Sequence, residues 1–139
     1  MEQRYIFTAL ILLAIVAGCI ASKPVEKMQE QYIDINVTQA KDMIDRGEVF
    51  ILDVRRQDEF DAGHINGATL LALQDIPTQE ELKNKLKELP ADRKILVYCR
   101  SGVRSAEASG ILIKNGFTQV YNMKDGITGW TNAGYPTTK

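Results

Sequence analysis

The sequence contains few of the residues that bind metal ions. Among its 139 residues there are two cysteines and one histidine. The two cysteines do not form a Cys-x-x-Cys pair, and a single histidine cannot make a site by itself. Protein zinc sites need three or four such ligands at short, characteristic spacings. We therefore expect neither a metal ion nor another cofactor.

A large net charge and low-complexity sequence are also absent. The 17 lysines and arginines nearly balance the 18 aspartates and glutamates, which gives a net charge of −1. This balance gives no reason to expect nucleic acid or an acidic membrane surface as a partner. With 45% hydrophobic and 25% charged residues, and no internal repeat, the composition is typical of one globular domain of ordinary size.

One long uncharged segment stands at the beginning of the chain. Residues 5–21 carry no charge, and residues 6–16 are almost wholly apolar, as in the hydrophobic region of a secretory signal. The tetrapeptide that follows, Val16-Ala17-Gly18-Cys19, resembles the lipobox of prokaryotic lipoproteins. That resemblance implies cleavage before Cys19 and attachment of lipid to this cysteine. An uncleaved anchor is the alternative, because the 17 uncharged residues are close to the lower limit for a membrane span.

These features predict three segments. Residues 1–18 are expected to be a signal peptide with the lipobox at 16–19, residues 19–31 a polar tether, and residues 32–139 the folded domain. The protein is then exported and attached as a lipoprotein to the outer or periplasmic face of the cell membrane. The N-terminal anchor is its only expected contact with the membrane.

Short apolar runs and amphipathic stretches alternate from Tyr32 onward. Strands are expected at residues 32–35, 49–52, 68–73, 95–98 and 120–123. Helices are expected at residues 56–62, 78–89, 105–114 and 127–133, and a further one is capped by Asn36 or Thr38 and stopped at Gly47. Such alternation predicts an α/β fold with a parallel sheet of about five strands and helices on both faces. Ligands of such sheets bind at the carboxyl ends of strands, where Asp53 and Cys99 are placed.

Cys99 follows the strand-like run 94–98 and opens a loop that leads into a helix. The loop is Cys99-Arg100-Ser101-Gly102-Val103-Arg104. Its amides and the first free N–H groups of the helix should converge on one point, which favours an anion. These amides and the two arginines should lower the pKa of the thiol from about 8.5 toward neutrality. We expect a reactive thiolate at the bottom of a shallow pocket; a cysteine packed in the core would oppose this interpretation.

Three motifs resemble those of rhodanese-homology domains. The first is Leu52-Asp53-Val54-Arg55, followed by Glu59-Phe60 and Gly63-His64-Ile65-Asn66-Gly67-Ala68. The second is the active-site loop, Cys99-Arg100-Ser101-Gly102-Val103-Arg104-Ser105. The third is Asp125-Gly126-Ile127-Thr128-Gly129-Trp130, followed by Ala133-Gly134-Tyr135-Pro136. They occur in the order of the family and span residues 32–137. Many members have two adjacent glycines in the third motif, where this chain has Gly126-Ile127-Thr128-Gly129-Trp130. This difference concerns local packing rather than chemistry.

The resemblance implies a rhodanese-like fold and a single-domain thiosulfate or persulfide sulfurtransferase. Cys99 would attack the outer sulfur of a small sulfur-containing anion, form a persulfide and pass that sulfur to cyanide, a thiol or a protein acceptor. The amides of the loop would hold the sulfur, and Arg100 and Arg104 would attract the oxyanion. The expected binding residues are Arg100, Ser101, Gly102, Val103 and Arg104. Ser101 either donates to the substrate or caps the helix, and Asp53 and Arg55 are expected to brace the site.

Two other classes of function stay open. A cysteine phosphatase or arsenate reductase is disfavoured, because the tyrosine-phosphatase signature has five residues between cysteine and arginine. Here four residues separate Cys99 from Arg104, and the next residue is Ser105. A sulfide-binding module would usually lack the cysteine, whereas a sulfur carrier that depends on a protein partner would keep it. His64, Phe60 and Trp130 are interpreted as structural residues.

Overall fold

The structure is a computed structural model, and it describes residues 31–76 and 78–139. Its elements follow in the order β1 (Ile33–Ile35), α1 (Val37–Asp45), β2 (Val49–Asp53), α2 (Gln57–Ala62), β3 (Thr69–Leu70), the 3₁₀ turn η1 (Leu73–Asp75), α3 (Gln79–Lys87), β4 (Lys94–Tyr98), α4 (Val103–Lys114), β5 (Val120–Met123) and α5 (Gly126–Asn132). The strands form one five-stranded sheet in the order β1-β5-β4-β2-β3, and each neighbouring pair is parallel. This confirms the predicted α/β fold with a five-stranded parallel sheet.

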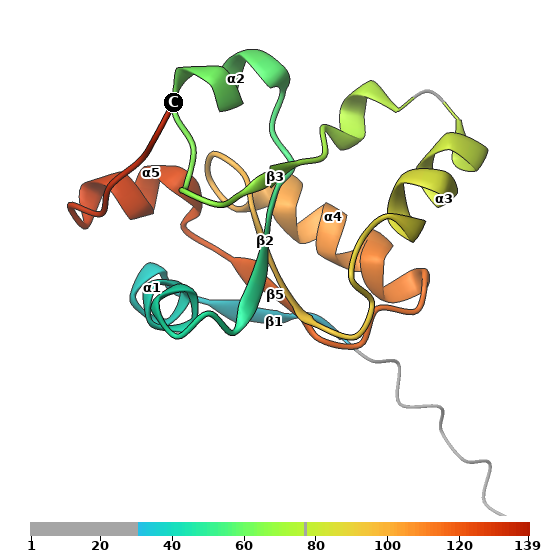
Figure 1. Cartoon of the computed structure of the whole chain (residues 1–139), viewed down its shortest axis with the longest axis horizontal. Helices are drawn as coiled ribbons and strands as arrows, with labels where there is room; N and C mark the ends of the chain where they lie inside the picture. The colour runs from blue at the N-terminus through green and yellow to red at the C-terminus, as the bar shows by residue number, and fades with distance from the viewer. Residues whose placement is uncertain (1–30, 77) are drawn as a thin grey trace, which may run out of the picture.

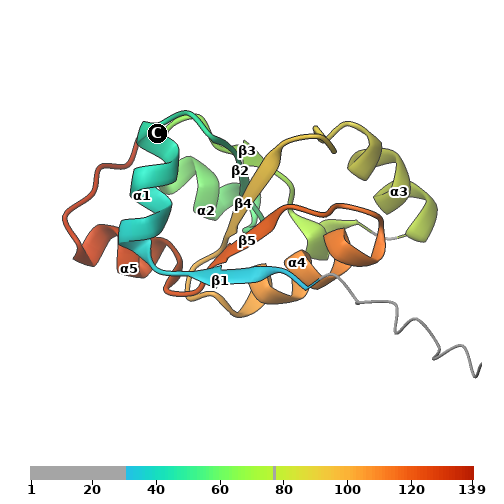
Figure 2. The ribbon, with the colours of Figure 1, turned by 90° about the horizontal axis from the view of Figure 1, so that it is seen from below.

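Helices cover both faces of the sheet (Figure 1, Figure 2). Along β4, Ile95 and Val97 pack in a core with residues of α3 and α4, whereas Leu96 and Tyr98 pack in a second core with residues of α1 and α5. All four side chains are completely buried, because a central strand of such a sheet is covered on both sides. Side chains alternate between the faces, so Cys99 follows Val97 on the α4 side.

The structure decides between the two caps considered for α1. The Asn36 side chain accepts a hydrogen bond from the Gln39 N–H at 2.9 Å, and the Gln39 side chain accepts one from the Asn36 N–H at 3.0 Å. This reciprocal pair is a capping box, and it satisfies two N–H groups that the helix leaves free. Asn36 is therefore the cap, and Thr38 lies inside the helix.

The strand expected over residues 68–73 is shorter than predicted. β3 contains Thr69 and Leu70, and a 3₁₀ turn follows within three residues. The Leu71 N–H, one residue beyond β3, still donates at 2.8 Å to the carbonyl of Asp53, the last residue of β2. β3 is thus a short strand at one edge of the sheet.

The N-terminal predictions fall outside the described residues. The signal peptide, the lipobox with Cys19 and all but the last residue of the tether lie in residues 1–30. In the part of the chain that the structure describes, no helix is long and apolar enough to cross a membrane. The signal peptide and the lipidation site therefore stay predictions from the sequence.

The end of the chain returns to α2, as Figure 1 shows. The backbones of His64 and Thr138 exchange two hydrogen bonds of 2.8 Å.

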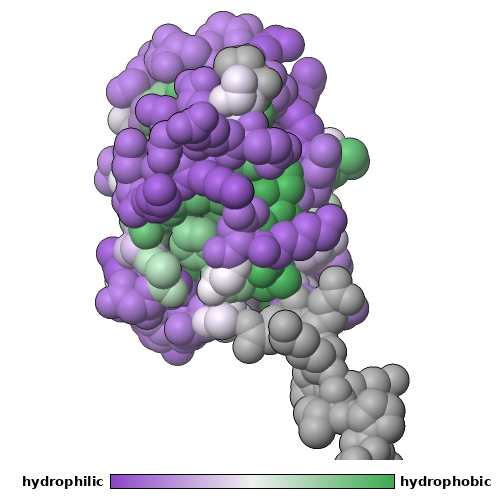
Figure 3. All heavy atoms as spheres, turned by 90° about the vertical axis from the view of Figure 1, so that its right-hand side faces the viewer, coloured by the Kyte–Doolittle hydropathy of each residue, from purple (hydrophilic) through white to green (hydrophobic). Residues whose placement is uncertain are grey.

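The opposite side of the molecule carries α3, where hydrophobic atoms show between hydrophilic side chains (Figure 3). A hollow of about 530 Å³ lies beside α3 there, between residues such as Phe50, Leu71 and Leu89. Cys99 does not line this hollow.

Candidate active site

The sulfur of Cys99 lies inside the loop that joins β4 to α4. The Gly102 N–H donates to Sγ at 3.1 Å, and the Ser105 hydroxyl lies within donating distance of both Sγ, at 3.4 Å, and the Gly102 carbonyl, at 3.1 Å. Burial alone would raise the pKa of this thiol. The hydroxyl of Ser105 and the N–H groups of Ser105, Ser101 and Gly102 outweigh that effect, so the pKa of Cys99 is lowered. The loop is therefore built to hold negative charge on sulfur.

The backbone of α5 turns the loop amides inward. The Ile127 N–H donates to the Cys99 carbonyl at 2.8 Å, and the Thr128 N–H donates to the Arg100 carbonyl at 3.1 Å. In a trans peptide the N–H points opposite to the carbonyl. Because both carbonyls are held by α5, the N–H groups of Arg100 and Ser101 are directed toward the interior of the loop.

Two glycines allow this close approach. Gly102 adopts a φ of +93°, which favours glycine, and a Cβ there would overlap the carbonyl of Lys124. Gly126 adopts a φ of +60°, and a Cβ there would overlap the backbone of Arg100 and Ser101. Gly102 is also the N-cap of α4, so Ser101 does not have the capping role considered for it.

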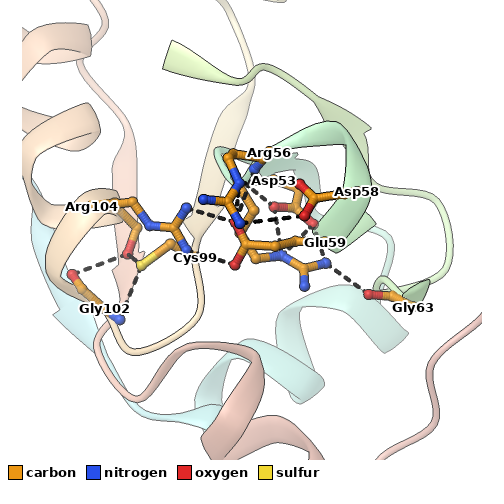
Figure 4. A network of polar contacts seen from close by, with 10 residues as sticks. Asp53, Arg56, Asp58, Glu59, Gly63, Cys99, Gly102 and Arg104 are labelled. Carbon is orange, nitrogen blue, oxygen red and sulfur yellow. Dashed lines mark hydrogen bonds and ion pairs between the residues drawn. The ribbon is translucent and has the colours of Figure 1, made fainter. Parts of the chain in front are cut away.

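Cys99 is less accessible than the shallow pocket predicted from the sequence. The residue is 1% exposed and belongs to the hydrophobic core between the sheet and α4, which counts against the predicted shallow pocket. Its sulfur is nevertheless held by polar groups of the loop rather than enclosed by hydrocarbon alone. Arg104 is close enough to Cys99 for their charges to interact, and Glu59 is paired with the guanidinium of Arg104 (Figure 4). Because the residue is 1% exposed, access to the sulfur requires surrounding side chains or the loop to move.

Arg104 is held by a carboxylate of α2. Its Nη1 and Nη2 donate to the Oε2 and Oε1 atoms of Glu59 at 2.8 and 2.9 Å. Glu59 Oε2 also accepts the N–H of Arg56 at 3.1 Å, which stabilises the beginning of α2. The guanidinium of Arg104 outweighs the effect of burial and lowers the pKa of Glu59 to about 2. The side chain expected to attract a substrate anion thus already binds an anion.

Glu59 was not singled out as a site residue from the sequence, although it belongs to the first family-like motif. Its partner is 45 residues away along the chain. An acidic residue in the first turn of a helix is common, because it interacts favourably with the helix dipole. The sequence therefore contains the residue but no local signal of its contact with Arg104.

Asp53 and Arg55 form a second ion pair at the carboxyl end of β2. Arg55 Nη2 donates to Asp53 Oδ2 at 2.7 Å, and Nε lies 3.0 Å from both carboxylate oxygens. Arg55 Nη2 also donates to the carbonyl of Gly63 at 2.7 Å. The pair is almost completely buried. It joins β2 to the end of α2, and so it supports the helix that carries Glu59 rather than contacting the sulfur of Cys99 directly.

The remaining side chains of the loop face away from Cys99. Arg100 and Ser101 are exposed, and Val103 is 75% exposed. Arg100 lines a hollow of about 390 Å³ between α2 and α5, together with Glu59 and Thr128. The structure therefore brings together the sulfur, the loop amides and Arg104, and it places Arg100 at a neighbouring hollow that Cys99 does not line.

His64 and Trp130 have positions that fit structural roles. The His64 ring stacks on Phe60 with ring centres 3.7 Å apart, and its Nδ1 lies 3.0 Å from the Phe60 carbonyl. Trp130 is 2% exposed and donates from Nε1 to the Pro136 carbonyl at 2.9 Å. Within residues 31–76 and 78–139, no cluster of three histidine, cysteine, aspartate or glutamate side chains could hold a metal ion.

This fold and this loop define a class of proteins, and comparison with known families identifies it. Residues 36–133 match the Rhodanese-like domain family. The chain therefore belongs to the rhodanese-like family, through one domain that this match places at residues 36–133.

Curated relatives show the chemistry associated with this class. A sulfurtransferase of Allochromatium vinosum is 34% identical over 94 residues, which cover 68% of this chain and 82% of that protein. Thiosulfate sulfurtransferase 18 of Arabidopsis thaliana is 34% identical over 116 residues, covering 77% of this chain and 84% of that protein. These relatives support sulfur transfer as the general chemistry of the chain.

A solved structure agrees with the fold. The crystal structure of a rhodanese-related protein from Thermoplasma volcanium is similar with a TM-score of 0.65 and 31% sequence identity. The similarity covers 77% of this chain and 98% of that chain. The rhodanese-like fold is thereby established from sequence and structure together.

Proposed function

We propose that this protein moves a sulfane sulfur from thiosulfate, a persulfide or a polysulfide to cyanide or a thiol, through a persulfide on Cys99. The observation that carries the proposal is the environment of the Cys99 sulfur. Hydrogen-bond donors of Gly102 and Ser105 contact it, and its pKa is lowered despite burial. A thiolate is the nucleophilic form of cysteine, so no separate general base is needed.

The proposed reaction has two displacement steps. In the first, the Cys99 thiolate attacks the outer sulfur of the donor, and the bond from that sulfur to the rest of the donor breaks. With thiosulfate, sulfite leaves with the bonding electron pair, and Cys99 becomes a persulfide with a negative terminal sulfur. In the second step cyanide or a thiolate attacks the terminal sulfur, and Cys99 leaves as the thiolate. The amides of the loop stabilise the negative sulfur in both steps.

Arg100 and Arg104 have separate proposed roles. Arg100 lies at the hollow between α2 and α5, where it attracts an anionic donor. Arg104 lies beside Cys99, where its guanidinium binds the oxyanion part of the donor once Glu59 has been displaced (Figure 4). Asp53 and Arg55 hold α2 in place, and Ser101, Gly102 and Val103 contribute backbone groups of the loop.

We also propose that the domain is exported and attached to the membrane at Cys19. The support is the uncharged segment of residues 5–21 and the lipobox-like sequence at 16–19. The parallel sheet adds an orientation. All strands are parallel, so they begin at the same end of the sheet, and the chain enters β1 at that end. Cys99 follows β4 at the other end, where the strands finish. The active-site loop then lies at the end of the sheet opposite the start of β1.

The first experiment is to incubate the purified protein with thiosulfate and to measure its intact mass. We expect a gain of one sulfur atom, which cyanide removes as thiocyanate. The Cys99→Ser variant should gain none, whereas Ser109→Ala, which changes a buried hydroxyl without contact to the sulfur, should load normally. Failure of every thiosulfate, polysulfide and persulfide donor to add sulfur at Cys99 would contradict the proposal.

The limited accessibility of Cys99 favours one second candidate, a sulfur carrier that receives its sulfur from a protein partner. Such a partner could displace the Glu59 side chain and open the route to a residue that is 1% exposed. The two functions differ in their kinetics. Loading by small donors at rates that support turnover indicates the enzyme, and loading by a persulfidated protein alone indicates the carrier.

A further inference from the structure

The contact between Glu59 and Arg104 has the geometry by which arginine binds an oxyanion. Two parallel hydrogen bonds of 2.8 and 2.9 Å join the two ends of the guanidinium to the two oxygens of one carboxylate. Figure 4 shows this pair and Cys99 in one view, and Arg104 is the member whose charge interacts with the sulfur. An incoming anionic donor needs the same nitrogen atoms that Glu59 already occupies.

We propose that Glu59 is a specificity-determining residue that competes with anionic sulfur donors for Arg104. The inference rests on the proposed function, in which Cys99 is the reacting residue. An uncharged reagent gains no attraction from the guanidinium, whereas an anion gains from Arg104 only after it displaces the carboxylate. Glu59 thus lowers the preference of the site for anions over uncharged reagents.

The surroundings of the pair support this role. Glu59 lines the hollow of about 390 Å³ that also contains Arg100. Arg104 lines a different hollow, of about 190 Å³, beside Glu107 and Ile111 of α4. The ion pair therefore joins one residue of each hollow, Glu59 of the first and Arg104 of the second. An anion in the hollow of Arg100 has the carboxylate of Glu59, and not Arg104, in the lining around it.

The pair is both persistent and displaceable. Its side chains are 18% and 35% exposed for Glu59 and Arg104, so water and small ions reach it. Glu59 is also held by the Arg56 N–H, which keeps the carboxylate in position when no donor is bound. Because the pKa of Glu59 is about 2, the carboxylate stays charged throughout the neutral range. The competition is therefore a constant property of the site and not a pH switch.

Two reagents that differ in charge test the proposal without sulfur transfer. Iodoacetate and iodoacetamide alkylate the same thiolate, and the first is an anion whereas the second is uncharged. The rates are measured at Cys99 by peptide mass spectrometry of the full chain, and their ratio is compared among variants. Changes in thiol pKa or in general accessibility alter both rates and largely cancel in the ratio.

Glu59→Gln should raise the iodoacetate-to-iodoacetamide ratio about five-fold, the scale expected from a partly exposed ion pair. The glutamine keeps an oxygen that accepts the Arg56 N–H, so α2 retains its capping contact. Asp58→Asn is the matched control. It removes the same charge one residue away, from an exposed carboxylate that pairs with Arg56 rather than Arg104, and it should leave the ratio within about two-fold.

Two results would overturn the proposal. An equal rise in both variants would mean that general electrostatics, and not the Arg104 contact, controls the ratio. No rise in Glu59→Gln would mean that incoming anions do not use Arg104. A second measurement then links the result to sulfur transfer: Glu59→Gln should lower the KM for thiosulfate and leave kcat unchanged. If no donor loads Cys99, the proposed function fails, while the alkylation ratio still decides the role of Glu59.

Discussion

Two arginine–carboxylate pairs lie near each other in this domain, and they differ in burial. Asp53 and Arg55 have side chains that are 0% and 6% exposed, whereas Glu59 and Arg104 are 18% and 35% exposed. The buried pair has further fixed partners, including the Gly63 carbonyl. The exposed pair is open to exchange with solvent and small ions. The same chemical contact therefore serves as a brace in one place and as a displaceable contact in the other.

The largest difference should appear when each pair is broken. Asp53→Asn leaves the guanidinium of Arg55 buried without its counter-charge, and we expect a loss of about 3–5 kcal/mol in the free energy of unfolding. Glu59→Gln should cost no more than about 1 kcal/mol, because its pair is partly exposed. Urea unfolding followed by circular dichroism measures both.

A double variant separates the charge from the packing. Adding Arg55→Met to Asp53→Asn removes the unpaired charge, and it should recover part of the lost stability. A loss below about 1 kcal/mol for Asp53→Asn alone would show that the buried pair is not the brace that its geometry indicates.

The hydroxyl of Ser105 should have the next largest effect. Ser105→Ala removes a donor 3.4 Å from Sγ and raises the pKa of Cys99. Since a hydrogen bond to a charged group is worth about 1.5–3 kcal/mol, alkylation by iodoacetamide at pH 7 should become about ten-fold slower. The rise in absorbance of the thiolate with pH, relative to Cys99→Ser, gives the pKa directly.

Ser109→Ala is the matched control for this prediction. Ser109 is also completely buried in α4, but its hydroxyl donates to the Ser105 carbonyl at 2.7 Å and not to the sulfur. Its thiol titration should match that of the unaltered protein. Equal shifts in both variants would assign the effect to repacking of α4 instead of to the hydroxyl of Ser105.

The smallest expected effect concerns acid. The pKa of Glu59 is lowered from 4.5 to about 2 in the folded protein, so its contribution to stability is present above pH 4.5 and is lost as the pH falls toward 2. Glu59→Gln should therefore lose less stability than the unaltered protein between these pH values. Unfolding curves at pH 5, 4 and 3 test this, and parallel loss in both proteins would argue against the ion pair in solution.

The alternation of apolar runs and amphipathic stretches was enough to predict the sheet and its helices. The loop around Cys99 was also visible in the sequence, because strand, glycine and helix follow each other within a few residues. The pairing of Arg104 with Glu59 was not, since it joins α4 to α2 across 45 residues of sequence. For the same reason the low exposure of Cys99 was missed: side chains from other elements decide it.

Backbone contact outside the loop has a consequence for the size of the group that fits inside it. The carbonyls of Cys99 and Arg100 accept hydrogen bonds from N–H groups of α5. The backbone at Gly126 is so close to Arg100 that a side chain at position 126 would overlap it. A loop widened by one residue would have to push α5 away from the sheet. We therefore expect the spacing between the backbone of this loop and the backbone of α5 to limit the size of the group that the loop can hold to a single transferred atom. This spacing should matter more than the charge of any side chain.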